Sequence, residues 1–420
     1  MPGNSRLCFA ACLLAASGGA AAEPALELST QARLRYDVHH NAQLTPGNDY
    51  EQGLFRGVLG AKLLASPGFG AYAEVGTGQV TARRGTASAS FQNAASLQQL
   101  YIKACGDIGG ARFGMQLGRQ EFADGPRQLL SPGDGPNLHR SWNGARLSIK
   151  GGRWRFGGYE LRATRLARGA FDEEVNNGER LRGLGASLAG GADKADGGLD
   201  AFWIQSRNPA FRSGRSVGAD ERDTVGLRWS GRRGRLQYDW TMARQGGRYM
   251  HRDVSAWGLF AVQSLALSGG AWKPRLTSRL DLASGGGTYQ GGKLRSFNHL
   301  YASSAYLGEG QFLGLSNLLM VTPGIAVSPT RSTTLSAEYG LARRIRESDA
   351  AYAGGMRAYA GTQNVPGRAI GGLFRLHGAW AASEHVTVNA NVERLEAGDV
   401  LRRAKLPSAG YVYLGATIRY

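Results

Sequence analysis

The chain has 420 residues, with 50 basic and 32 acidic side chains, a formal net charge of +18 and 63 glycines. Beyond the N-terminal segment, no stretch of about 18 uninterrupted apolar residues occurs, which excludes a helical membrane protein. The basic residues are 43 arginines and 7 lysines, and a charge of this size points to a polyanionic partner.

The N-terminus has the pattern of a secretory signal peptide. Arg6 supplies a positive charge, residues 7–16 are apolar, and residues 17–22 are small and end in an A-x-A pattern, which predicts cleavage before Glu23. We therefore divide the chain into a signal peptide (1–22) and a single barrel domain (23–420). Cleavage leaves Cys105 as the only cysteine, so neither an internal disulfide nor a cysteine metal site is expected. An exported chain does not meet cytoplasmic nucleic acid, so a polyanion that crosses the envelope is the expected partner.

The mature chain shows a period of two along most of its length. This pattern predicts an all-β fold, a transmembrane antiparallel β-barrel of about eighteen strands of the outer-membrane type. The predicted strands have about the length that a tilted strand needs to cross a bilayer. They lie near residues 25–37, 52–64, 68–79, 96–105, 111–120, 142–150, 153–164, 179–189, 198–206, 223–231, 234–244, 255–266, 273–283, 314–325, 332–342, 369–380, 385–394 and 410–420.

Short turns alternate with longer loops between these strands. Turns such as SPG, GDIGG and GRRG join the strand pairs that start at strands 2, 4 and 10, and longer segments follow strands 1, 3, 5, 7, 9, 13 and 15. This alternation is typical of periplasmic turns and extracellular loops, so both termini are expected in the periplasm. A soluble β-sandwich or propeller is the alternative, but no blade-length repeat supports it.

The last eleven residues, GYVYLGATIRY, alternate strictly between an apolar and a more polar face. A chain that ends on an aromatic residue in such a strand is typical of the closing strand of an outer-membrane barrel. Val412, Leu414 and Ile418 are expected to face lipid, and Arg419 the lumen.

The same parity assigns charged side chains to the lumen. In strand 153–164 we expect a β-bulge at Gly157-Gly158, which would keep Tyr159 and Leu161 on the lipid face. Eight acids are expected inside: Glu27, Asp37, Glu74, Glu160, Asp239, Asp281, Glu338 and Glu393. Seventeen bases are expected inside, a difference of +9 that predicts a preference for anions: Arg33, Arg35, Arg56, Lys62, Lys103, Arg112, Arg146, Lys150, Arg153, Arg155, Arg162, Arg228, Arg235, Arg275, Arg279, Arg375 and Arg419.

Arginine stays charged at biological pH and binds a carboxylate at two points, so such a wall could hold sugar carboxylates loosely and repeatedly. The alternative for any one arginine is that it pairs with a lumen acid and only stiffens the wall.

Two segments resemble the alginate export family of outer-membrane barrels. They are 117–147 (LGRQEFADGPRQLLSPGDGPNLHRSWNGARL) and 296–329 (SFNHLYASSAYLGEGQFLGLSNLLMVTPGIAVSP). The resemblance implies a monomeric eighteen-stranded barrel with a constricted, arginine-rich pore, gating segments and a polyuronate as cargo. It assigns Arg56, Arg119, Arg140 and Arg146 to the pore. Parity in strand 111–120 places Arg119 on the lipid side, so its pore position requires a bulge there.

No enzyme motif occurs in the sequence: it has no G-x-S-x-G, H-E-x-x-H or Walker A pattern, and no metal site or cofactor is expected. The expected function is passive export of an anionic exopolysaccharide, alginate or a similar polyuronate. An anion-selective porin for small solutes is the nearest alternative, and an outer-membrane hydrolase a more distant one. Expected partners are the polysaccharide, outer-membrane lipid and the barrel-insertion machinery, with a periplasmic export scaffold as a further candidate.

Overall fold

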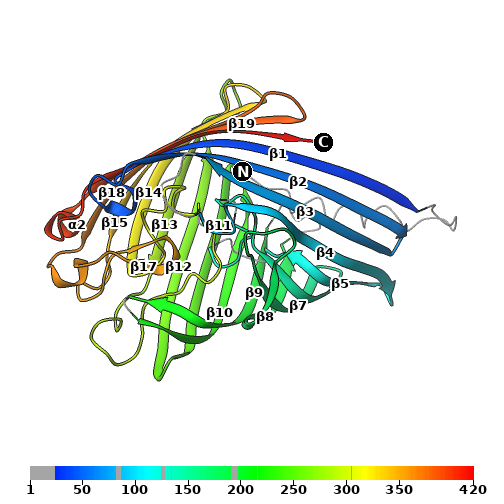
Figure 1. Ribbon diagram of the computed structural model, residues 1–420, viewed down its shortest axis with the longest axis horizontal. Coiled ribbons are helices and arrows are strands. Elements are labelled where there is room, and N and C mark those ends of the chain that lie inside the picture. The colour runs from blue at the N-terminus through cyan, green and yellow to red at the C-terminus, as the bar shows by residue number, and fades with distance from the viewer. Residues whose placement is uncertain are drawn as a thin grey trace.

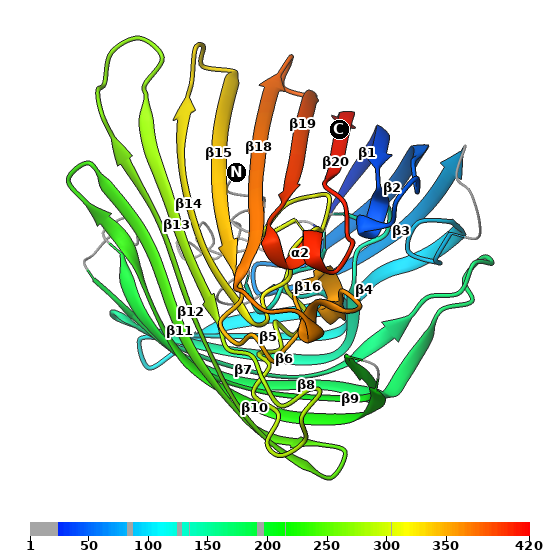
Figure 2. The same ribbon diagram turned by 90° about the vertical axis from the view of Figure 1, so that its left-hand side faces the viewer.

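A computed structural model describes residues 24–81, 87–123, 128–133, 135–190, 197–214, 216–303 and 305–420. The predicted signal peptide, residues 1–22, lies outside the described residues and stays a prediction. The described chain forms one barrel with loops folded into one of its mouths (Figures 1 and 2).

Eighteen antiparallel strands form the wall, and pairing of β1 with both β2 and β20 closes it. The first nine are β1 (Ala25–His40), β2 (Tyr50–Ser66), β3 (Phe69–Thr81), β4 (Asn93–Ile108), β5 (Ala111–Glu121), β6 (Ser141–Gly151), β7 (Trp154–Arg165), β8 (Glu174–Ala189) and β9 (Gly198–Ser213). The others are β10 (Ser216–Arg233), β11 (Leu236–Tyr249), β12 (Arg252–Ala266), β13 (Arg275–Ala283), β14 (Leu318–Val327), β15 (Thr333–Arg343), β18 (Ala369–Ala381), β19 (Val386–Ala397) and β20 (Ala409–Arg419).

The remaining elements are short and belong to loops. β16 (Tyr352–Ala353) pairs with β17 (Arg357–Ala358) in a small hairpin. The helical turns are η1 (Ala42–Leu44), η3 (Gly354–Met356), η4 (Thr362–Asn364) and α2 (Asp399–Arg403). Among the described residues, no helix is long and apolar enough to cross a membrane.

The eighteen predicted strands are confirmed, and several are longer than predicted at the end with the long loops. The clearest case is the predicted long loop after residue 206, where β9 and β10 instead continue as a projecting hairpin to Ser213 and from Ser216. Both faces of this hairpin carry polar residues, such as the outward Arg207 and the inward Ser206. The apolar alternation that marks a membrane strand is therefore absent there, although the backbone pairing continues.

The predicted bulge at Gly157-Gly158 is wrong. The register of β7 with both neighbours runs without a shift through these glycines. Tyr159 and Leu161 therefore point inward, and Leu161 is fully buried. Glu160 and Arg162, which were expected in the lumen, face outward and are exposed. The two corrections remove one base and one acid from the lumen, so they leave the predicted charge difference unchanged.

In the other strands, the side chains predicted to face lipid lie on the outer face of the barrel. Leu26, Leu28 and Leu34 of β1 are 63–67% exposed on the outer face, as expected for side chains that face lipid. The two ends of the chain meet at the rim with the short turns, where the Thr30 N–H donates to the Tyr420 carbonyl and the Tyr420 N–H donates to the Thr30 carbonyl. Both ends of the described chain therefore lie on one side of the barrel.

At the other end, three long loops fold inward rather than away from the wall. They are loop 122–140, loop 284–317 and loop 344–368, and α2 lies beside them (Figure 2). Their buried apolar side chains and the inward side chains of the wall form the main hydrophobic core. The core of this molecule thus lies inside the barrel mouth.

Candidate functional site: the lumen and its loop plug

Three arginines gather on the inner face of β1 and β2. Arg33 lies directly opposite Arg56 in the strand register, and Arg35 lies two residues further along the same face. Arg56 contacts the side-chain oxygen of Gln31 (2.5 Å) and the His139 ring (2.6 Å). Like charges directly opposite each other destabilise a sheet pair, so this juxtaposition needs anionic or polar groups close to it.

Loop 122–140 supplies some of these polar groups. Arg33 donates to the Pro136 carbonyl (2.8 Å) and to the side chain of Asn137 (3.4 Å). His139 contacts Glu121 at 2.7 Å while its other ring nitrogen faces Arg56. The wall arginines thus hold an inward loop in place with part of their donors.

Arg35 pairs with an acid of its own strand. Its guanidinium lies 2.7 Å from Asp37, and it also lies over the ring of Tyr413, with 5.3 Å to the ring centroid. Tyr413 and the buried Tyr411 project from the inner face of β20. This part of the wall therefore combines a cation, a carboxylate and two phenol rings.

A similar arrangement is found on β13. Arg279 contacts Asp281 at 3.2 Å and lies over the ring of Tyr306, with 4.4 Å to the centroid. Tyr306 belongs to loop 284–317 and donates to Asp281 at 2.7 Å. Here too, an arginine, an acid and a tyrosine link the wall to an inward loop.

Two further lumen arginines form pairs across strands. Arg375 binds Glu338 of the neighbouring strand, and Arg228 binds Asp239 at 2.6 Å and Asp200 at 3.4 Å. These contacts match the alternative role in which an arginine stiffens the wall. They leave each guanidinium fixed in direction, which is also what a weak, repeated binding site requires.

The other predicted lumen bases differ in depth. Arg146 faces inward and lies over the ring of Phe122 at 4.8 Å. Lys103 and Arg155 face inward on β4 and β7 by the register. Lys62 pairs with Glu27 at 2.9 Å near the rim with the short turns. Arg153 and Arg419 lie at that rim, and Arg153 donates to the carbonyls of Ala189 and Gly190 in the adjoining turn.

Arg119 does not face the lumen. The register places it opposite Leu100, which is exposed on the lipid face. Its guanidinium donates to the Leu97 carbonyl (2.9 Å) and pairs with Glu173 at 2.8 Å. The strand backbone is unusual just before it, because Gly118 has a φ of +131° and a Cβ there would lie 2.2 Å from a backbone oxygen. Arg119 thus ties β4 to the segment after β7, which differs from its expected pore position.

Arg140 is partly buried and packs against the loops rather than projecting into the lumen. It donates to the carbonyls of Ser131 and Tyr301, both at 3.2 Å, and lies over the Tyr301 ring at 5.0 Å. Burial lowers the pKa of Arg140. This arginine joins loop 122–140 to loop 284–317, a structural role that its spacing in the sequence did not reveal.

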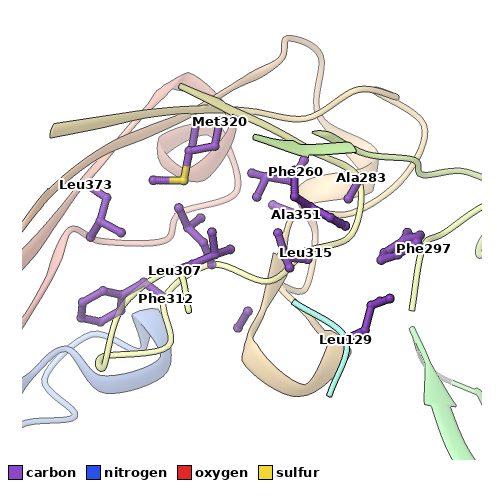
Figure 3. Packing of buried hydrophobic residues seen from close by; sticks show 14 of the residues in the cluster. Leu129, Phe260, Ala283, Phe297, Leu307, Phe312, Leu315, Met320, Ala351 and Leu373 are labelled. Atoms are coloured by element: carbon purple, nitrogen blue, oxygen red, sulfur yellow. The ribbon is translucent and has the colours of Figure 1, made fainter. Parts of the chain in front are cut away.

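We use the word plug for the packed parts of the three inward loops and α2. Figure 3 shows side chains from the loops and the wall in contact with one another. Among them are Phe297, Phe312 and Leu315 of loop 284–317, and Phe260 and Met320 of the wall. All five are at most 3% exposed. The apolar burial that stabilises the plug is therefore shared with the barrel.

Polar ties complete the plug. Asp349 of loop 344–368 is fully buried and accepts from the Gly286 N–H (2.6 Å) and the Ser296 hydroxyl (2.7 Å) of loop 284–317. Glu393 of the wall accepts from the N–H groups of Glu309 (2.8 Å) and Gly310 (2.9 Å). Glu393 was expected in the lumen, but its partners could not be expected, because loop conformation leaves no periodic signal.

Several inward charges were not expected from the sequence. Arg222 is fully buried and pairs with Asp220 at 2.8 Å, and Asp200 faces the lumen beside Arg228. Arg222 and Asp220 lie in the segment that was expected to be a loop. Extending the alternation of β10 past its apolar part would have found them. Within the described residues, no group of three His, Cys, Asp or Glu side chains is placed to hold a metal.

The fold and the lumen define an outer-membrane β-barrel channel. A family model described as alginate export matches residues 25–414. The chain belongs to the alginate export family.

Solved structures with the same architecture are outer-membrane porins of the Occ type. Pseudomonas aeruginosa OccK5 (OpdH) is 12% identical, with a TM-score of 0.61 and coverage of 94% of this chain and 97% of that one. P. aeruginosa OccK2 (OpdF) in complex with glucuronate is 12% identical, with a TM-score of 0.59 and coverage of 94% and 96%. Acinetobacter baumannii OccAB1 is 10% identical, with a TM-score of 0.63 and coverage of 94% and 96%. These identities establish the fold alone. No curated protein matches the chain.

Proposed function

We propose that this barrel is a passive channel for an anionic polysaccharide, alginate or a similar polyuronate, with an arginine-rich lumen as the conducting surface. The observation that carries the proposal is the opposed pair Arg33 and Arg56, with Arg35 beside it, on the inner face of β1 and β2. Such a concentration of positive charge on the inner wall favours anions in the lumen. A polyuronate supplies a carboxylate on each sugar, in the geometry that a guanidinium binds at two points.

The ion pairs of the wall fit weak and repeated binding. Arg35, Arg279 and Arg375 each contact an acid, so an incoming carboxylate must compete with a neighbouring one. Competition lowers the affinity at each position, which allows a polymer to advance rather than remain bound. The tyrosine rings beside Arg35 and Arg279 add flat surfaces on which a sugar ring can pack.

The family match and one of the structural relatives support a uronate as the cargo. The OccK2 structure is a complex with glucuronate, a single uronic acid, and the family name refers to a polymer of such units. We further propose that the short turns and both chain ends face the periplasm, as in other bacterial barrels. The barrel would then function as a monomer, reach the membrane through the barrel-insertion machinery, and receive polymer from a periplasmic export scaffold.

An anion-selective porin for small solutes is the second candidate, because the structural relatives are porins. Chain length separates the two. A polymer contacts several lumen arginines at once, so its effective affinity rises with length, whereas a small anion contacts one or two at a time.

The experiment measures block of chloride flux through the reconstituted protein by oligouronates of increasing length. We expect block at lower concentrations as the oligomers lengthen, weaker block at high salt because the pairing is screened, and little block by the monomer. Neutral dextrans of matched size are the control. Block that ignores oligomer length, or equal block by dextran, would favour the small-anion porin.

A further inference from the structure

Six arginines lie on the outer face of one sector of the wall, formed by β7, β8, β9 and β11. Four belong to strands that follow one another around the wall, and the strand register places Arg162 opposite Arg180 and Arg180 opposite Arg207. We call this set the arginine belt: Arg162 of β7, Arg180 and Arg182 of β8, Arg207 of β9, and Arg244 and Arg248 of β11.

The belt begins where a membrane-crossing segment should end. From the short-turn end of each strand to the arginine there are nine residues on β7 (Trp154 to Arg162), ten on β9 (Gly198 to Arg207) and nine on β11 (Leu236 to Arg244). A tilted strand crosses the hydrocarbon layer in about 9–11 residues. The arginines therefore lie at the headgroup level of the leaflet next to the long loops.

Aromatic residues mark the same level. Trp257 is directly opposite Arg244 and is 46% exposed on the outer face. Trp203 lies on the outer face of β9, two outward positions below Arg207. Tryptophan is enriched at membrane–water interfaces, where its ring is in the apolar layer and its N–H group is hydrated. The outer position of the belt is thus supported by neighbours of a different chemistry.

Four acids lie among these arginines on the outer face: Glu221 is directly opposite both Arg207 and Arg248, Asp253 is directly opposite Arg248, and the other two have partners of their own. Glu160 pairs with Arg182 at 3.0 Å, and Asp223 accepts from the indole of Trp203 (3.0 Å). Arg207, Arg244 and Arg248 are exposed, and among the described residues their side chains have no hydrogen bond or ion pair within the chain. Six arginines against four acids leave this patch positive, and its three exposed guanidinium groups can bind an anion from the membrane.

We propose that the arginine belt binds the phosphate groups of lipid A, the phosphorylated glycolipid of the outer leaflet. Guanidinium binds phosphate through two parallel hydrogen bonds, and directly opposed residues of neighbouring strands have Cα atoms only about 4.5–5.5 Å apart. One phosphate can thus contact Arg207 of β9 and the directly opposed Arg180 of β8. The site fixes the barrel to one sector of its lipid shell and lies outside the lumen.

The test uses the purified full-length barrel in neutral detergent, titrated with fluorescent lipid A. The variant Arg207→Gln/Arg244→Gln/Arg248→Gln removes the three available groups. Each basic residue near an anionic lipid surface contributes about 1 kcal/mol, so we expect binding to weaken about a hundredfold. The matched control is Arg232→Gln/Arg233→Gln/Arg235→Gln, which removes the same charge at the short-turn end, and we expect it to bind within threefold of wild type.

Two results would overturn the proposal: unchanged binding by the belt variant, and equal loss in the control variant. The second would mean that only total charge matters. Heat-modifiable migration on gels checks that both variants are folded. The inference uses the proposed orientation but not the proposed cargo. Loss of lipid A binding with intact oligouronate block, or the reverse, would therefore separate this proposal from the channel function.

Discussion

The plug should depend strongly on one buried carboxylate, Asp349. It joins loop 344–368 to loop 284–317 by accepting from the Gly286 N–H and the Ser296 hydroxyl, and it also accepts from the Tyr352 hydroxyl at 2.8 Å. Burial and the nearby carboxylate raise the pKa of Tyr352, so its hydroxyl remains a donor. The change Asp349→Ala removes the acceptor for these three donors and for the Ala350 N–H, which donates to Asp349 at 2.9 Å.

The loss of loop stability follows from the number of buried hydrogen-bond donors that lose their acceptor. A buried donor without a partner costs about 1–3 kcal/mol, so four donors correspond to roughly 4–12 kcal/mol. The Ser296 and Tyr352 hydroxyls also contact the Thr288 hydroxyl, at 2.9 Å and 3.1 Å, and water can enter from the adjacent mouth. We therefore expect the lower part of the range, about 4–5 kcal/mol. Each 1.36 kcal/mol is a factor of ten in an equilibrium, and the ratio of released to packed loops should rise at least a hundredfold.

The assay is single-channel recording in planar bilayers. We expect the Asp349→Ala barrel to spend more time in high-conductance states than wild type, because released loops leave more of the lumen to ions. Asp253→Ala, which removes an exposed acid on the outer face of β12, is the control and should conduct as wild type does. Heat-modifiable migration on gels should show that both variants remain folded.

An Asp349→Ala variant that is folded and has the conductance of wild type would show that this expectation is wrong. The loops would then either remain packed without Asp349, contrary to the hydrogen-bond argument, or leave ion flow unaffected when released. Protection of loop 344–368 from protease would distinguish these two causes.

Three more tests use positions on β7, in loop 284–317 and at the seam, where β20 pairs with β1 to close the barrel. In a Cys105→Ser background, a thiol reagent should modify Arg162→Cys readily and Leu161→Cys slowly, because Arg162 is exposed on the outer face and Leu161 is buried inside. The opposite order of reactivity would show that β7 does contain the bulge at Gly157-Gly158. Burial and the charge of Arg140 lower the pKa of His299 to about 4, below its unfolded value of about 6.5. His299 is therefore protonated only at a lower pH in the packed loop than in the released loop. The stability of the packed loop should be complete above pH 6.5 and should fall by up to roughly 3 kcal/mol as the pH drops toward 4. Open-channel events should become more frequent over that window in wild type but not in His299→Gln. Deleting Tyr420, whose backbone pairs with Thr30 at the seam, should slow assembly, as measured by the heat-modifiable fraction, and normal assembly would contradict its role in the closing strand.

The wall could be predicted from the sequence because a membrane barrel repeats one physical requirement in every strand. Lipid-facing positions must be apolar, so Leu26, Leu28 and Leu34 alternate with the inward Glu27, Arg33 and Arg35, and the period reveals both the strand and its face. The closing strand was predicted at 410–420 in this way, and it spans Ala409–Arg419.

The errors occurred where that requirement ends. Beyond the lipid layer both faces of a strand are polar. The ends of β9 and β10 that form the projecting hairpin therefore show no alternation of apolar and polar residues, and they were expected to form a loop. On β7, Leu161 is apolar because it packs under the plug, which looks the same in sequence as facing lipid. The side chain of Arg162 was then expected inside, although it is exposed on the outer face.

The plug could not be predicted for a different reason. Its loops are held by single contacts between distant residues, such as Asp349 with Ser296 and Arg140 with Tyr301. Contacts of this kind have no fixed spacing and no periodicity. The resemblance of segments 117–147 and 296–329 to the family indicated that these regions matter, and the structure shows that both contribute to the plug.

The proposed function depends above all on a lumen whose fixed charge is positive, and the reversal potential measures the sign of that charge. In a planar bilayer with a potassium chloride gradient, the wild-type channel should reverse on the chloride side of zero. The double variant Arg56→Glu/Arg146→Glu, which changes two inward bases on β2 and β6, should shift the potential toward zero or past it. The matched variant Arg207→Glu/Arg244→Glu on the outer face should leave it unchanged. A wild-type channel that reverses on the potassium side would mean that the lumen is not positive and that the proposed cargo is wrong.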